Sequence, residues 1–207
     1  MTLGWNWLGI LLWVVLILYL VFIVQNIRKR HLRMIIRDRK RFDAKTFALD
    51  IVELLVLFAG IFFMTRQTFF DNPDLADRGA VTSKIEYRPL ILSTGDNGSY
   101  YVTAHSEKKT KPAQSYSFYS DGNHITVDSH YATISSGDKP SAVNAAMIPY
   151  SKKDLNKADK HYQKAFMAVY TARYNNNWRN GLGLHAGRIA VRYYLLRVPD
   201  DTFIRNK

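Results

Sequence analysis

The sequence WNWLGILLWVVLILYLVFIV, residues 5–24, decides the architecture of the N-terminal part of the chain. Asn6 is its one polar side chain. A helix of this length spans about 30 Å, the thickness of the hydrocarbon core of a bilayer. A helix buried in a soluble domain rarely stays apolar on every face for so long. Residues 1–27 are therefore predicted to form a transmembrane helix with a short outer stub.

A cleaved signal peptide is the alternative interpretation of this segment. It requires a basic residue before the apolar run and a small-residue cleavage site after it. Residues 1–7 carry no basic side chain, and the sequence QNIR at 25–28 has no small-residue site. We therefore expect the helix to be retained.

Residues 46–64 form the second candidate span. The apolar run 54–64 is too short alone, so a spanning helix must include residues 47–53 and with them Asp50 and Glu53. A helix lying in the membrane interface is the alternative. Asp50 and Glu53 are three residues apart and share a helix face. They are predicted either to pair with basic residues at 39–45 or to contact another membrane protein.

The segment between the two spans, residues 28–45, is strongly basic. It holds nine Lys or Arg residues against two acidic residues. Basic residues concentrate in short cytoplasmic loops, so this loop is predicted to be cytoplasmic and both termini extracytoplasmic. Its periodicity also allows an amphipathic helix on anionic lipids of the inner leaflet. The residues predicted to face those lipids are Arg28, Lys29, Arg30, Arg33, Arg37, Arg39, Lys40 and Arg41.

Aromatic residues flank the predicted spans. Trp5 and Trp7 precede the first, and Phe69 and Phe70 follow the second. Amphipathic aromatic rings are enriched at membrane interfaces, so these four residues are predicted to anchor the helices there.

Residues 65–82 read as a linker, and residues 83–207 as an extracytoplasmic α+β domain. Segments rich in β-branched and aromatic residues predict strands near 84–92, 99–106, 115–120, 124–128, 131–135 and 188–198. Ser151 opens a predicted helix whose apolar stripe reaches Val169, and Asn175–Asn177 with Gly181 ends it. This order predicts a mostly antiparallel sheet with one covering helix, anchored to the membrane by the two N-terminal helices.

The composition limits the chemistry that the chain can perform. The absence of cysteine excludes disulfides, Cys-ligated zinc, Fe–S clusters and thiol catalysis. The sequence has no P-loop, no zinc-protease motif and no nucleophile elbow, so no cofactor, metal ligand or catalytic residue is predicted. The net charge of +12 favours an anionic partner. The predicted polyanion contacts are Lys108, Lys109, Lys111, Lys152, Lys153, Lys157, Lys160 and Lys164.

The opening WNWLGILLWVVLILYL at 5–20, followed by IRKRHLRMIIRD at 27–38, resembles a family of small membrane proteins from lactic-acid bacteria. The likeness is clearest over residues 4–45. No activity or functional residue is established for that family, so none carries over. The resemblance implies a Gram-positive host with one membrane and a cell wall, and hence teichoic acids as the natural polyanion.

The leading hypothesis is a non-enzymatic protein of the cell envelope, in the plasma membrane. Its basic, tyrosine-rich outer domain would bind a protein partner or an anionic wall polymer. Nucleic acid is not expected as a ligand, because the basic loop lies between two spans. One alternative is an accessory subunit of a transporter, sensor or wall-synthesis complex that couples through the second span. The other is a wall-active hydrolase or transferase whose site has no recognisable motif.

Overall fold

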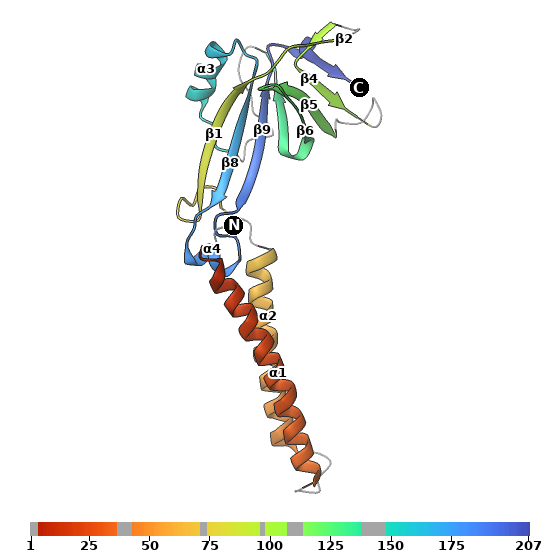
Figure 1. Ribbon diagram of the computed structural model, residues 1–207, viewed down its shortest axis with the longest axis vertical. Coiled ribbons are helices and arrows are strands. Elements are labelled where there is room, and N and C mark those ends of the chain that lie inside the picture. Colours follow the sequence, from red (N-terminus) through yellow and green to blue (C-terminus); the bar gives the residue numbers. More distant parts are fainter. Residues whose placement is uncertain (1–3, 37–42, 71–73, 96–97, 107–113, 138–147) are drawn as a thin grey trace. The chain divides into compact units, whose positions relative to one another are not determined.

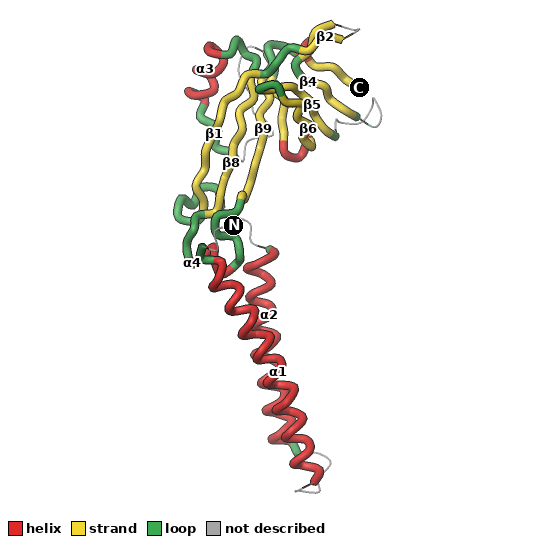
Figure 2. Tube along the Cα trace, in the orientation of Figure 1, coloured by secondary structure: helices red, strands yellow, loops and turns green. Residues whose placement is uncertain are grey.

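The computed structural model describes residues 4–36, 43–70, 74–95, 98–106, 114–137 and 148–207. The chain divides into two compact units, which Figures 1 and 2 show as a helical part and a part built mainly of strands. The first, the helical unit, is Met1–Val81 with Tyr174–Arg188. The second, the sheet unit, is Thr82–Arg173 with Ile189–Lys207.

Two long helices, α1 (Asn6–Ile36) and α2 (Ala44–Phe69), lie side by side in the helical unit (Figure 1). Helix α1 continues through the first part of the basic segment that was predicted to be a loop. Asp43 caps α2, because its carboxylate accepts a hydrogen bond from the Thr46 backbone N–H at 3.1 Å. The helices approach closely at Gly60, where a Cβ would lie 2.8 Å from Leu16 Cδ2.

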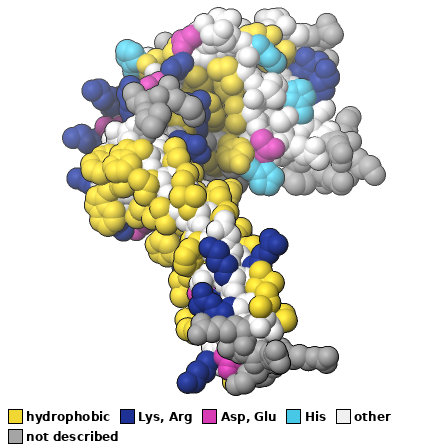
Figure 3. Space-filling model, turned by 60° about the horizontal axis from the view of Figure 1, so that its bottom comes forward, with side chains coloured by type: hydrophobic (Ala, Val, Ile, Leu, Met, Phe, Trp, Pro, Cys, Tyr) yellow, Lys and Arg dark blue, Asp and Glu magenta, His cyan; other side chains and the backbone are white. Residues whose placement is uncertain are grey.

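Both helices expose most of their apolar side chains. Only 11% of the most apolar stretch of α1 is buried, and 17% of that of α2. Figure 3 shows hydrophobic side chains covering the visible face of the helices, with Lys and Arg near the connection between them. A core helix of a soluble domain would bury this surface. The two helices are long and apolar enough to cross a bilayer, and their exposure indicates membrane association.

The segment Tyr174–Arg188 belongs to the helical unit and packs on the first turns of α1. Asn6 binds the backbone of Ala186 twice, donating to its carbonyl and accepting from its N–H, both at 3.0 Å. Gly9 and Gly181 allow the close approach. A Cβ on Gly9 would lie 2.7 Å from the Gly181 carbonyl oxygen, and one on Gly181 would lie 2.2 Å from that of Trp5. This segment, whose residues Asn175–Asn177 and Gly181 were predicted only to end a helix, is thus a packed element that contains α4 (Trp178–Leu182).

The sheet unit is α+β and mostly antiparallel. Its first sheet, sheet A, has the order β1-β8-β9-β7, and its second, sheet B, has the order β10-β4-β5-β6. A small third sheet pairs β2 with β3. Two pairs are parallel, β7 with β9 and β4 with β10. The sequence predicted one sheet, whereas the described residues form three. The strands are β1 (Val81–Pro89), β2 (Ser93–Gly95), β3 (Gly98–Tyr100), β4 (Val102–His105), β5 (Ser115–Ser120), β6 (Asn123–Asp128), β7 (Ala132–Ser135), β8 (Phe166–Tyr174), β9 (Ile189–Arg197) and β10 (Ile204–Asn206).

Sheet A is covered on both faces. Helix α3 (Lys152–His161) packs on one face, where Leu155 and Ala158 contact Phe166, Ala168 and Leu195. Sheet B packs on part of the other face. The core there contains Val102 and Phe118 from sheet B, with Met167, Val169 and Leu196 from sheet A.

The helix predicted to reach Val169 ends instead at His161, and strand β8 was not predicted. Gln163 and Lys164 adopt positive φ values of 51° and 63°, which a continuing helix does not permit. The residues that follow are buried on alternating sides, with Phe166 toward α3 and Met167 toward sheet B. A strand buried on both faces is a continuous apolar run, which periodicity alone does not distinguish from a helix.

The tyrosines that follow α2 divide between the surface and the core. Tyr119 and Tyr131 are exposed, but Tyr170, Tyr174 and Tyr193 are buried. Tyr170 and Tyr193 are paired across β8 and β9, the two inner strands of sheet A, and Tyr174 ends β8 with its ring stacked on that of His185. The tyrosines of the predicted tyrosine-rich domain therefore lie partly on its surface and partly in its core.

A buried ion pair joins α3 to sheet A. The Arg197 side chain is fully buried, and its guanidinium donates two hydrogen bonds to the Asp159 carboxylate, at 2.9 and 3.1 Å. The same group also donates to the carbonyl oxygens of Ser135 and Gly137, at 3.2 and 2.6 Å. The carbonyl oxygens accept hydrogen bonds from the guanidinium but carry no net charge. The Asp159 carboxylate supplies the opposite charge that makes the burial of Arg197 tolerable.

Replacing Asp159→Ala is expected to lower the free energy of unfolding of the sheet unit by about 3–5 kcal/mol, since it leaves a buried, unpaired guanidinium. Denaturant unfolding of the full chain in detergent, followed by tyrosine fluorescence, measures this loss. Asn156→Ala, at an exposed position of the same helix, is the control and is expected to change stability little. Equal midpoints for the two variants would contradict the role given to this ion pair.

Candidate functional site

A groove on sheet A gathers basic side chains. It lies on the face opposite α3, along the part of β1, β8 and β9 next to sheet B, and has a volume of about 460 Å³. Its lining includes four cations, from β1, β8 and β9, and Glu86 is the one carboxylate among its described lining residues. We call this hollow the basic groove; its cations are Lys84, Arg88, Arg173 and Arg192.

Strand geometry explains why these charges share one face. Successive side chains of a strand point to opposite faces, so Lys84, Glu86 and Arg88 line the groove while Ile85 and Tyr87 pack toward α3. The antiparallel register of β8 and β9 pairs Thr171 with Arg192, which brings that arginine to the same side. The floor is apolar and includes Met167, Val169 and Tyr194 of the core between the sheets.

Two of the cations hold the carboxylate of Glu86. Lys84 Nζ lies 2.9 Å from one oxygen and Arg88 Nη2 lies 2.8 Å from the other. Hydrogen bonds from Lys84 and then Arg88 lower the pKa of Glu86 to about 2. Glu86 therefore stays ionised at any physiological pH, and it is one negative charge among the four cations of the groove. Arg88 also reaches Asp121, at 3.4 Å.

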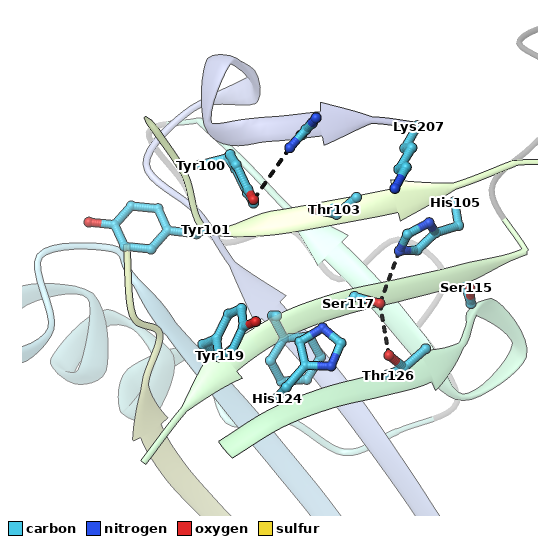
Figure 4. Close-up of a pocket in the computed structure, with 12 residues that line it drawn as sticks. Tyr100, Tyr101, Thr103, His105, Ser115, Ser117, Tyr119, His124, Thr126 and Lys207 are labelled. Carbon is cyan, nitrogen blue, oxygen red and sulfur yellow. Dashed lines mark hydrogen bonds between the residues drawn. The ribbon is translucent and has the colours of Figure 1, made fainter. Parts of the chain in front are cut away.

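A second hollow lies on the outer face of sheet B (Figure 4) and has a volume of about 540 Å³. We call it the polar cradle. Ser117 hydrogen-bonds both His105 and Thr126, and these side chains come from three neighbouring strands. Tyr119 and His124 lie side by side, with ring centroids 4.8 Å apart. The basic side chains at this hollow are Arg205 and Lys207.

Ser117 and His105 form a serine–imidazole contact, which is the pairing that activates many serine nucleophiles. The Ser117 Oγ lies 3.0 Å from His105 Nε2, within the range of such a pair. However, Ser117 sits in mid-strand between β4 and β6, paired with Thr103 and Thr126. A strand with partners on both sides has its backbone N–H groups in the ladder, so they do not form an oxyanion hole. The arrangement is therefore better suited to binding.

A polar cluster joins the two long helices. Arg30 of α1 lies 2.7 Å from Asp50 Oδ1 and 2.6 Å from Glu53 Oε2 of α2. His31 Nε2 lies 3.0 Å from Asp50 Oδ2, and Asn26 donates to Glu53 at 2.9 Å. Asp50 is buried. Asp50 and Glu53 thus find partners on α1, whereas the predicted partners were the basic residues at 39–45, of which 39–42 lie outside the described residues.

The other basic residues of the predicted lipid-facing loop divide into two groups. Arg28, Lys29 and Arg33 are exposed on α1, whereas Arg30 turns toward α2. The remainder lie outside the described residues; these are Arg37, Arg39, Lys40 and Arg41.

The predicted polyanion contacts that the structure describes do not line either hollow. The lysines of α3 are exposed, but α3 covers the face of sheet A opposite the basic groove. Lys164 is half-buried just after this helix. The exposed residues are Lys152, Lys153, Lys157 and Lys160, and those outside the described residues are Lys108, Lys109 and Lys111.

The predicted interface anchors are exposed at the ends of the long helices. Trp5 and Trp7 lie at the start of α1, where the Trp5 N–H also donates to Asn176. Phe69 and Phe70 lie at the end of α2 and are each more than two-thirds exposed. Exposed aromatic rings at helix ends are compatible with an interfacial position.

Sequence reasoning missed the cations of the basic groove and the side chains of the polar cradle. The alternation of Lys84, Glu86 and Arg88 was a readable signal for one charged strand face. The position of Arg173 was obscured by the mistaken extension of the preceding helix. Arg205 lay beyond the last predicted strand, so nothing in the sequence joined it to β4.

A model of a protein family without an established function matches residues 4–205 of the chain. The chain belongs to this family. The family name suggests lactic-acid bacteria, in agreement with the resemblance of residues 4–45. No curated protein and no solved structure matches the chain significantly. Membership covers both units of the chain but brings no activity with it.

The contribution of the polar cluster to the stability of the helical unit can be tested by substitution. Arg30→Gln leaves Asp50 and Glu53 without their cation, so the helical unit is expected to lose roughly 2–4 kcal/mol of stability. All four tryptophans, at positions 5, 7, 13 and 178, lie in this unit, so tryptophan fluorescence during denaturation in detergent reports on it selectively.

Arg33→Gln is the matched control, because it removes the same charge from an exposed site on the same helix. Its unfolding midpoint is expected to stay near that of the unmodified chain. Adding Asp50→Asn to Arg30→Gln is expected to restore part of the loss, since it removes the carboxylate left unpaired. An Arg30→Gln variant as stable as Arg33→Gln would disprove the role of the cluster in holding the helices together.

Proposed function

We propose that this chain is a non-enzymatic, membrane-anchored protein of the cell envelope whose outer domain binds an anionic wall polymer in the basic groove. The observation that carries the proposal is the groove itself, in which four cations face one carboxylate across about 460 Å³. A linear polyanion gains from cations placed in a row. Lys84 and Arg88 are four residues apart on one strand, which separates their backbones by about 13 Å.

The proposal places α1 and α2 in the plasma membrane, with both termini and the sheet unit on the wall side. The exposed apolar faces of the helices support the insertion. The excess of Lys and Arg in residues 28–45 supports a cytoplasmic connection, because such residues stay on the inner side. With this orientation the basic groove would lie on the same side of the membrane as the anionic polymers of the wall.

A protein partner of acidic surface is the other occupant that the groove could take. An accessory-subunit role through α2 has less support, since Asp50 and Glu53 already have partners on α1. Ionic strength separates these cases: binding of a polyanion weakens steeply with salt, whereas a contact between apolar helix faces does not.

The orientation can be tested with introduced cysteines, because the natural chain has none. Lys153→Cys on α3 and Lys45→Cys at the start of α2 are both exposed positions. In intact cells stripped of their wall, a membrane-impermeant maleimide is expected to label Lys153→Cys fully and Lys45→Cys only after permeabilisation. The reverse pattern, or labelling of both before permeabilisation, would refute the proposed topology.

Binding can be measured with purified poly(glycerol phosphate) teichoic acid and the full chain in nanodiscs. The Arg88→Gln, Arg192→Gln double variant is expected to bind more weakly and to lower the slope of log affinity against log salt by about two, one for each cation removed. The matched control is Lys153→Gln, Lys157→Gln on α3, which removes equal charge from the opposite face of sheet A.

The control is expected to leave the salt slope unchanged. If both double variants weaken binding equally, net charge and not the groove accounts for the interaction. If the unmodified chain does not bind the polymer at any salt concentration, the proposed ligand is wrong.

A further inference from the structure

The polar cradle of sheet B has no part in the binding proposed for the basic groove. Its rear face is occupied, because Val102, Phe118 and Ile125 point from the same strands into the core. Its front face carries hydroxyl, imidazole and phenol groups around a hollow of about 540 Å³, within the usual range for small-molecule sites. We propose that the polar cradle binds a saccharide that carries a negative charge.

The strand register builds a straight row of polar side chains across the cradle. Arg205 pairs with Thr103, Thr103 with Ser117, and Ser117 with Thr126, so four neighbouring strands each present one residue. Adjacent strands are about 4.8 Å apart, which fixes the spacing of these groups. Ser117 is largely buried and its hydroxyl already joins His105 to Thr126, so the row is preorganised (Figure 4).

Such a row matches the hydroxyl groups of a sugar ring. Hydroxyl and imidazole groups both donate and accept hydrogen bonds, as sugar hydroxyls do. The rings of Tyr119 and His124 flank the row and offer an apolar surface to the C–H face of a sugar. Tyr119 is 42% exposed, so its ring is available to a ligand.

The cationic side chains at the Arg205 end of the row favour a ligand with a negative charge. Arg205 is held in place by Tyr100, with the guanidinium carbon 5.3 Å from the ring centre and Nη1 3.4 Å from the hydroxyl. Lys207 adds a second cationic side chain, and the described lining of the cradle includes no Asp or Glu side chain. A phosphate or carboxylate on the sugar would therefore meet a cation that is already positioned.

The test uses the full chain in nanodiscs with its tyrosines replaced by 3-fluorotyrosine, and ¹⁹F NMR as the readout. The signal of Tyr119 is identified by its loss in Tyr119→Phe. Glucose 1-phosphate is expected to shift this signal in a saturable way, methyl glucoside to shift it more weakly, and inorganic phosphate to bind least.

Arg205→Gln is expected to weaken glucose 1-phosphate binding about tenfold and to leave methyl glucoside binding unchanged, because only the charged contact is lost. Lys207→Gln, at an exposed position, gives a smaller effect in the same direction and guards against misfolding of the first variant. The remaining tyrosine signals report whether each variant is folded.

Arg192→Gln in the basic groove is the matched control and is expected to leave sugar binding unchanged. No shift with any sugar overturns the proposal, and so does inorganic phosphate binding as tightly as glucose 1-phosphate, which would mark a simple anion site. Teichoic acid binding through the basic groove is measured with Arg88 and Arg192, so the two proposals can fail separately.

Discussion

The sheet unit depends on one strand that is buried on both faces. Phe166 and Ala168 of β8 pack beneath α3, while Met167 and Val169 pack against sheet B. Side chains alternate along a strand. A residue of β8 that packs beneath α3 therefore directs the next residue of β8 toward sheet B. The Arg197–Asp159 pair on neighbouring β9 then ties the covering helix to the same sheet.

The two hollows follow from how the sheets are covered. Sheet B covers only part of the face of sheet A opposite α3, and the remaining surface carries the charged side chains of β1, β8 and β9 as the basic groove. Sheet B in turn places its apolar residues in the shared core, which leaves its other face polar. The groove carries a row of charges, on which the proposed polymer binding rests, whereas the cradle carries a row of hydrogen-bonding groups, on which the proposed sugar binding rests.

The helical unit differs from the sheet unit, because most of the apolar surface of its two long helices is exposed. Polar side chains in such helices are costly unless they are paired, and several of those in α1 and α2 have partners. Asn6 binds the backbone of Ala186, and Arg30 binds both Asp50 and Glu53. These contacts connect segments far apart in the sequence, and Gly9 and Gly181 permit the packing beside Asn6.

The sequence by itself determined the two apolar helices, the α+β class, strand β5 with the residue limits predicted for it, and the last long strand, because length, hydropathy and alternation are local properties. The residues of β8 were wrongly predicted as part of a helix, because a strand buried on both faces and a buried helix have the same continuous apolar pattern. Tertiary structure decided which charges meet. Arg192 faces Lys84 and Arg88 across the groove, and Arg205 lines up with Ser117, only because strand pairing sets the register between distant segments. No local pattern contains that register, so both candidate sites emerged from the fold.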